Sequence, residues 1–215
     1  MIKLKDLLKE IEAATKKVYD GPPINSKKTS IIGDTVAGIS MLYGAGNFHG
    51  TVIDYGCGRI ARNAEFLRSK GLKVYAYDPF WGNSANGYDG ISNIKPDDIF
   101  DVGFTSYVLN VVRVSDEKEI LSWMNSHCNQ QYHITRNKDI TKMIETNLTK
   151  AGDNMVKKFF VEWFGGDLNN ITQEIIDEFS IYGTATTQGF QRIPILEDYG
   201  YNLLKSTSGY KIYEK

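Results

Sequence analysis

The sequence is poor in cysteine, with only Cys57 and Cys128 among its 215 residues. They fall in unrelated segments and lack the spacing of metal ligands, so we expect neither a disulfide framework nor a metal site. Long apolar runs are absent too, and no stretch approaches the roughly 20 apolar residues that a membrane-spanning helix needs. These absences predict a reduced, cytoplasmic protein without a membrane partner, and they leave the oligomeric state open.

An excess of charge of one sign is also lacking. Lys and Arg number 25 against 26 Asp and Glu, which gives a formal net charge of -1. Nucleic-acid binding is therefore neither required nor excluded, and any phosphate contact needs a local patch such as Lys27-Lys28 or Lys157-Lys158. The length suits one well-buried core with a small appended cap, so we expect a single domain over residues 1–215.

What is present is an alternation of strand-like and helix-like segments. Short apolar runs are typical of buried strands, and longer segments with apolar residues at helical spacing lie before and between them. This pattern predicts an α/β fold with a doubly wound, mostly parallel sheet and helices on both faces. The strands expected are 51–55, 73–77, 101–106 and 131–135, and the helices expected are 2–19, 30–43, 60–70 and one that Ser115 caps.

The last third of the chain departs from this alternation. Residues 201–207 and 210–214 are two strand-like runs around a Ser-Gly turn, which predicts an antiparallel C-terminal hairpin on the sheet edge. Residues 137–190 carry apolar residues at helical spacing, and we interpret them as a small helical cap over the carboxyl end of the sheet. Residues 184–192 are polar and glycine-containing, typical of a loop that either contacts an acceptor or only connects elements.

The most specific feature is a glycine turn between a strand and a helix, at Asp54-Tyr-Gly-Cys-Gly58. Gly56 and Gly58 let the backbone turn sharply and approach a ligand without a Cβ in the way. The helix that follows offers free amide donors at its N-terminus. Asp78 ends the next strand, twenty residues after Gly58, where its carboxylate can accept hydrogen bonds from both hydroxyls of a ribose. This layout predicts a nucleoside cofactor.

The charge of Asp54 distinguishes two such cofactors. Residues 56–61, Gly-Cys-Gly-Arg-Ile-Ala, satisfy the loose Gly-x-Gly-x-x-Ala fingerprint of an NAD site. A dinucleotide places its pyrophosphate at this turn, where a fixed carboxylate would repel it. S-adenosylmethionine (SAM) carries a sulfonium and an ammonium group, which the carboxylate attracts. We therefore favour SAM, while an NAD(P)-dependent oxidoreductase and a strand–turn–helix that binds no nucleotide stay open as alternatives.

On these residues the sequence resembles the class I (seven-stranded) SAM-dependent methyltransferases. Residues 53–58 match the first motif of the family, residues 74–78 match its acidic second strand, and residues 104–110 lie where it places the fourth strand and the following turn. The Thr-x-x-Gly-Phe-Gln-Arg at 186–192 resembles a bacterial and phage group whose acceptor is unassigned. The resemblance implies a Rossmann-like methyltransferase fold and methyl transfer from SAM to an acceptor, either nucleic acid at a nucleobase or a small molecule.

The resemblance also implies roles for individual residues. The glycine turn would line the methionine end of SAM, Asp78 would hold the ribose, and the next two residues would lie near the adenine. Residues that follow the fourth strand would border the transferring methyl group. The cofactor-binding residues expected are Asp54, Tyr55, Gly56, Cys57, Gly58, Asp78, Pro79, Phe80, Ser106 and Tyr107.

The catalytic residues expected are Tyr107, Asn110, His133 and Arg136. His133 is either a base or a structural strand residue, and Arg136 either holds an anionic acceptor group or pairs with a surface acid. The turn at 105–110 differs from the Asp/Asn-Pro-Pro-Tyr/Phe turn of amino-methylating DNA enzymes, and no Pro-Cys follows for attack at cytosine C5. The scarcity of bases keeps a further alternative open, a SAM-binding sensor or scaffold without catalytic activity.

Overall fold

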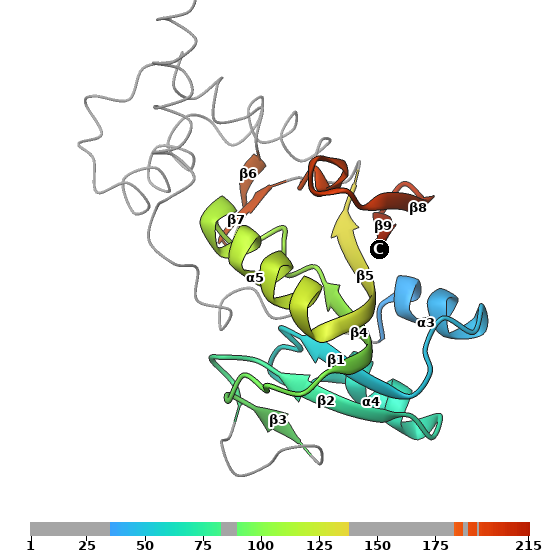
Figure 1. The fold of residues 1–215 in the computed structure, drawn as a ribbon. Helices are drawn as coiled ribbons and strands as arrows, with labels where there is room; N and C mark the ends of the chain where they lie inside the picture. Colours follow the sequence, from blue (N-terminus) through green and yellow to red (C-terminus); the bar gives the residue numbers. More distant parts are fainter. Residues whose placement is uncertain (1–34, 83–89, 138–182, 187–188, 193) are drawn as a thin grey trace, which may run out of the picture.

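The computed structural model describes residues 35–82, 90–137, 183–186, 189–192 and 194–215 (Figure 1). Its centre is a seven-stranded sheet with the order β3-β2-β1-β4-β5-β9-β8. The strands of this sheet are β1 Thr51–Tyr55, β2 Lys73–Tyr77, β3 Ile91–Ser92, β4 Phe100–Ser106, β5 Cys128–Arg136, β8 Asn202–Ser206 and β9 Tyr210–Glu214.

The strand directions confirm the predicted topology. Strands β3, β2, β1, β4 and β5 run parallel, whereas β9 is antiparallel to both β5 and β8. Strand β1 pairs with β2 on one side and with β4 on the other. The strand order therefore runs outward from β1 in both directions, first to β2 and β3 and then to β4 and β5. The carboxyl ends of β1 and β4 therefore form the switch point at which open α/β sheets bind ligands.

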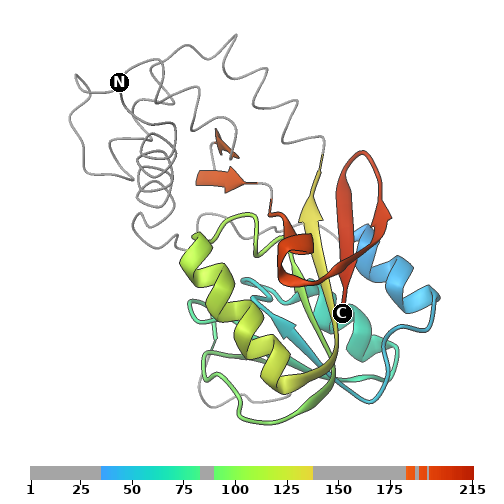
Figure 2. The ribbon, with the colours of Figure 1, turned by 45° about the horizontal axis from the view of Figure 1, so that its top comes forward.

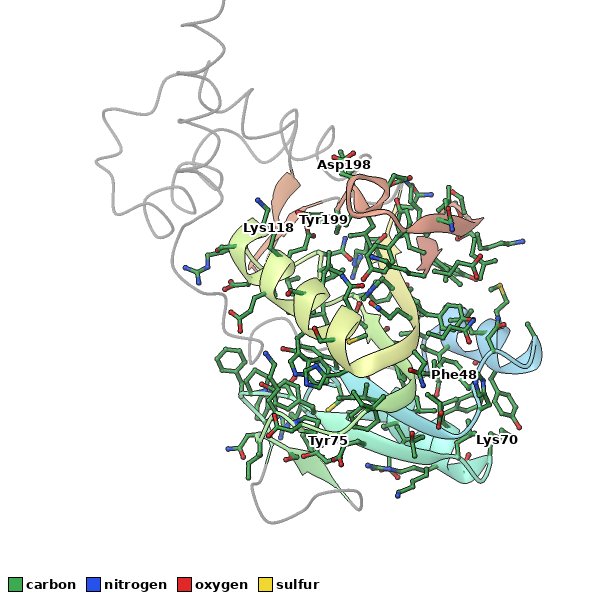
Figure 3. All side chains as sticks on the ribbon, in the orientation of Figure 1. Phe48, Lys70, Tyr75, Lys118, Asp198 and Tyr199 are labelled. Atoms are coloured by element: carbon green, nitrogen blue, oxygen red, sulfur yellow. The ribbon has the colours of Figure 1, made fainter. Side chains whose placement is uncertain are left out.

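One face of the sheet is covered by α3 (Ala37–Gly44) and α4 (Arg62–Ser69). Apolar residues of both helices are fully buried in one cluster with residues of β1, β2, β4 and β5, and α4 packs mainly on β2. Phe48, labelled in Figure 3, packs edge-on against Phe104 and Tyr132, with ring centroids 5.4 and 6.1 Å apart. This face is a conventional apolar core, and burial of its apolar surface is the main force that holds the helices on the sheet.

The opposite face is covered by α5 (Val114–His127) and the short 3-10 helix η3 (Leu196–Tyr199). In Figure 2, α5 crosses in front of the sheet while α4 lies behind it. This core is rich in tyrosine, and the Tyr75 hydroxyl donates a hydrogen bond of 3.0 Å to the Ile94 carbonyl. The two faces together confirm the doubly wound arrangement that the sequence predicts.

Three helix starts differ from the prediction. The helix predicted from residue 60 begins at Arg62, because Ala61 adopts a left-handed conformation with φ of +44°. The helix predicted from residue 30 begins at Ala37 within the described residues, because Val36 is still extended. Ser115 does not cap α5, which begins one residue earlier without a side-chain cap. Instead Arg113 and Asp116 pair across the first turn, with an Nε–Oδ2 distance of 2.8 Å. A local ion pair thus takes the place of the expected serine cap.

The prediction of a loop at residues 184–192 is wrong. Strands β6 (Gly183–Thr186) and β7 (Gly189–Arg192) form an antiparallel ribbon there. The ribbon lies beyond the N-terminal end of α5 in both Figure 1 and Figure 2. The remainder of the predicted cap and the helix predicted at 2–19 lie outside the described residues.

Candidate functional site

The glycine turn lies at the carboxyl end of β1 and has the geometry that its two glycines predict. Gly56 and Gly58 adopt φ of +77° and +72°, which only glycine accepts readily. The amides of Gly56 and Cys57 donate to the Tyr77 carbonyl at 2.7 and 3.0 Å, which joins the turn to the end of β2. A Cβ at Gly56 would lie 2.5 Å from Cγ2 of Val108, so the turn also packs directly against the segment after β4.

Asp78 joins this turn to the loop after β2. Its carboxylate is almost completely buried, with 2% exposure. Oδ2 accepts a hydrogen bond of 2.9 Å from the Gly58 amide, while Oδ1 accepts bonds of 2.9 and 3.3 Å from the amides of Phe80 and Trp81. A ribose diol would share or replace these donors, since a carboxylate offers about four acceptor positions.

Asp54 lies on the face covered by α4, close to the turn. Its side chain has no exposed surface, and neither carboxylate oxygen has a hydrogen-bond partner among the described residues. The pKa of Asp54 is raised to about 8, mainly by burial, and the charge of Asp78 contributes in the same direction. The backbone amide of Ala64 and the positive charge of Arg68 lower this pKa, although neither group meets the geometry of a hydrogen bond to the Asp54 carboxylate. The chemistry of this site therefore fits a cation, because a positive group nearby would stabilise the carboxylate.

Cys57 and Tyr55 contribute to the turn in different ways. The Cys57 thiol is half-buried, and burial, followed by the charges of Asp54 and Asp78, raises its pKa, which keeps it protonated. Tyr55 points to the α5 face, where its ring lies 4.8 Å from that of Tyr77. Its side chain therefore packs in the core, and only its backbone is part of the turn.

The segment after β4 brings the remaining predicted residues to the same edge. Tyr107 adopts φ of +58°, a left-handed conformation that is uncommon for tyrosine. Its amide donates to the Ile134 carbonyl at 2.8 Å. The buried Asn110 accepts a 3.0 Å hydrogen bond from the Arg136 amide through its Oδ1. Asn110 thus holds the end of β5 beside this segment.

His133 lies apart from this edge, on the sheet face opposite to Asp54. It is fully buried, its Nδ1 lies 2.8 Å from the Thr105 Oγ1, and its ring packs edge-on against Tyr201. Burial, together with the charge of Lys215, lowers the pKa of His133 to about 3. A neutral imidazole with so low a pKa is a poor proton acceptor at neutral pH, and the surroundings favour a structural role.

Three residues of the site escaped prediction from the sequence. The Arg59 guanidinium lies over the Trp81 ring, 5.5 Å from its centroid, and joins the turn to the loop after β2 beside the half-exposed Phe80. Val108 is the residue that packs on Gly56. The position of Arg59 next to Gly58, and of Trp81 three residues after Asp78, was the available signal.

The order and direction of the strands decide the fold. Strands β2 and β3 extend from one side of β1, β4 and β5 continue on the other, and the last strand inserts antiparallel between β5 and β8. This is the class I methyltransferase fold. It confirms the fold that the resemblance implies.

Comparisons with known proteins find methyltransferases at low similarity. The chain is similar to the magnesium protoporphyrin IX methyltransferase of Synechocystis PCC 6803 with bound S-adenosylhomocysteine (SAH), at 17% identity and a TM-score of 0.47, over 100% of this chain and 87% of that one. It is also similar to coclaurine N-methyltransferase bound to N-methylheliamine and SAH, at 11% identity and a TM-score of 0.41, over 100% and 87%. No protein-family model and no curated protein matches the sequence. The fold assignment rests on the sheet topology alone.

Within the described ranges, no group of three or more His, Cys, Asp and Glu side chains is arranged to hold a metal ion. In the same part of the chain, every helix is too short or too polar to span a bilayer.

Proposed function

We propose that this protein binds SAM and transfers its methyl group to an acceptor. The observation that carries the proposal is Asp54, a fully buried carboxyl group without a described hydrogen-bond partner, beside a glycine turn at the switch point of the sheet. In its ionised form, which a bound cation favours, this carboxylate attracts the sulfonium and ammonium groups of SAM and repels the pyrophosphate of NAD. It therefore disfavours the oxidoreductase alternative, although the turn satisfies the loose NAD fingerprint.

The chain's own residues supply binding and alignment. Gly56 and Gly58 allow close approach of the methionine end, Asp54 attracts its positive charge, and Asp78 holds the ribose. Ser106 and Tyr107, at the end of β4, border the acceptor side. When bound, SAM supplies a methyl group that its sulfonium makes electrophilic. Alignment and exclusion of water are then the main contributions of the protein.

This proposal needs no base from His133. Proton removal matters only for an acceptor that still holds its proton at neutral pH. His133 is buried on the other face, and its Nδ1 is already engaged by Thr105. We therefore leave His133 out of the catalytic group and retain Tyr107, Asn110 and Arg136 as candidates at the carboxyl edge.

The proposal is tested by thermal unfolding with SAM, SAH and NAD in parallel. A ligand at about a hundred times its dissociation constant stabilises the folded protein by roughly 2.7 kcal/mol, which raises Tm by several degrees for a chain of this size. We expect this shift with SAM and SAH and none with NAD. A shift with NAD alone would reject the proposal.

A second function is a SAM-binding sensor or scaffold without catalysis, favoured by the burial and low pKa of His133. Incubation of the protein with methyl-labelled SAM and separated DNA, RNA, protein and metabolite fractions distinguishes the two. Label transfer to any fraction, with matching release of SAH, excludes the sensor and identifies the acceptor class. Binding of SAM without transfer to any fraction supports the sensor.

A further inference from the structure

A cation lies next to the proposed methyl-transfer position. Arg136 is the last residue of β5, and Tyr107 directly follows the last residue of β4. The guanidinium carbon of Arg136 lies 5.6 Å from the centroid of the Tyr107 ring, within the range of a cation–π contact. The half-buried guanidinium is thus held at the carboxyl edge of two adjacent strands.

The backbone fixes this pair from both sides. Asn110 binds the Arg136 amide, and the Tyr107 amide binds the Ile134 carbonyl. Tyr107 keeps its left-handed conformation at some cost in free energy, which persists only where the surroundings determine it. The position of the tyrosine ring beneath the guanidinium is therefore built into the fold.

The same segment contacts the glycine turn. Val108 follows Tyr107 and packs on Gly56, while the Ser106 hydroxyl is buried without a hydrogen-bond partner among the described residues. Residues 106–108 thus have the glycine turn on one side and Arg136 on the other. A molecule seated at this segment would lie within reach of both.

We propose that Arg136, positioned by Tyr107, binds a carboxylate or phosphate group of a small-molecule acceptor. As the acceptor half of the proposed methyltransferase, this subsite rests on the proposed function. A guanidinium is suited to such a group because its planar fork donates two parallel hydrogen bonds to an oxyanion.

A small molecule is favoured over a nucleic acid because a phosphate backbone is held by several cations at once. The net charge of -1 adds no basic field. A single carboxylate or phosphate group of a small molecule, by contrast, suits the planar fork of one guanidinium.

The test measures the affinity of benzoate, phenyl phosphate and the neutral benzamide by ligand-observed NMR titration, with and without saturating SAH. Wild type is compared with Arg136→Gln, Arg136→Lys and the control Lys118→Gln, which removes the same charge from an exposed position on α5 (Figure 3). We expect wild type and Lys118→Gln to bind at least one anion about tenfold more tightly than benzamide. Arg136→Gln should lose this preference, and Arg136→Lys should retain part of it.

The inference is overturned if wild type shows no preference for either anion over benzamide, or if Arg136→Gln keeps the preference. A short single-stranded oligonucleotide is titrated in the same way. If it binds wild type more tightly than both small anions do, and if Arg136→Gln abolishes this binding, the acceptor is a nucleic acid and the small-molecule proposal is overturned. Benzoate and phenyl phosphate distinguish a carboxylate from a phosphate acceptor. The affinity for SAH, measured separately by calorimetry, should agree within about twofold between wild type and each variant. If wild type does not bind SAH, the proposed function is rejected independently of the anion result.

Discussion

Asp54 carries a cost in the ligand-free protein that a bound cation would reduce. A buried carboxyl group that has no hydrogen-bond partner among the described residues is unfavourable in either protonation state, and more so when it is charged. This is why its pKa rises to about 8. The same residue that favours SAM in the sequence therefore also links the proposed SAM binding to pH.

The affinity for SAM should increase as the pH is raised from 6 to about 8. Asp54 is mostly protonated below its pKa of about 8, and the cation binds the carboxylate, so binding releases a proton in that range. Calorimetry at pH 7 in two buffers of different ionisation enthalpy measures this proton release. Asp54→Asn should bind SAM more weakly and without the proton release, and equal release in both proteins would contradict the assignment.

Asp78 is structural as well as a candidate ribose ligand. Its carboxylate accepts three backbone amides from two loops, so Asp78→Ala should both weaken SAM binding and lower the free energy of unfolding by about 1–3 kcal/mol. Asp78→Asn keeps one carbonyl acceptor and should lose less stability. Denaturation of the ligand-free proteins and calorimetry with SAH measure the two effects separately, and unchanged SAH affinity in Asp78→Ala would exclude the ribose role.

Between elements, the close contact of the glycine turn with the segment after β4 defines the site. Gly56 has a positive φ and also lacks room for a Cβ beside Val108. Gly200 has nearly the same φ, +78°, with nothing within 4 Å of its ideal Cβ position. Gly200 is therefore a matched control for Gly56, because a substitution there tests the positive φ without a steric overlap.

Gly200→Ala should cost about 1–2 kcal/mol of stability from backbone conformation alone. Gly56→Ala should cost more, by about 1–3 kcal/mol, because the new methyl group overlaps Val108. Val108→Ala in the Gly56→Ala background should recover part of that difference. Chemical denaturation of the four proteins measures it, and equal losses at Gly56 and Gly200 would show that the contact is unimportant.

Elements buried in the sheet could be predicted from the sequence, whereas polar or very short ones could not. Strands β1 and β2 match their predicted bounds because buried parallel strands are continuous apolar runs. Strand β3 has two residues, too few for a pattern, and the ribbon β6–β7 has a polar, glycine-containing sequence that also suits a loop. The start of α5 was missed because the ion pair of Arg113 with Asp116, rather than a Ser115 cap, stabilises its first turn.

In the candidate site too, some residues could be predicted from the sequence and others could not. The glycine turn and Asp78 were predictable because they follow strands with a fixed local spacing. The conformation of Tyr107 and its contact with Arg136 were not, because they depend on residues 29 positions apart that only the pairing of β4 with β5 brings together. Likewise, the burial of His133 depends on Tyr201, far along the chain.

At the scale of the whole molecule, the sheet topology collects these features at one edge. Asp54, Asp78, Tyr107 and Arg136 come from four different strand ends, and the parallel arrangement of β1, β2, β4 and β5 places all of these ends together. His133 lies within β5 rather than at its end, which is why it falls outside the group. The predicted function thus follows from topology together with the charge of one residue.

The most direct test of this account is calorimetric titration of the wild-type protein and Asp54→Asn with SAM and with NAD at pH 7. We predict that wild type binds SAM at least tenfold more tightly than Asp54→Asn does, and that neither protein binds NAD. NAD binding by wild type that is as tight as its SAM binding, or SAM binding that is indifferent to the substitution, would contradict the claim that the buried carboxyl selects a cationic cofactor.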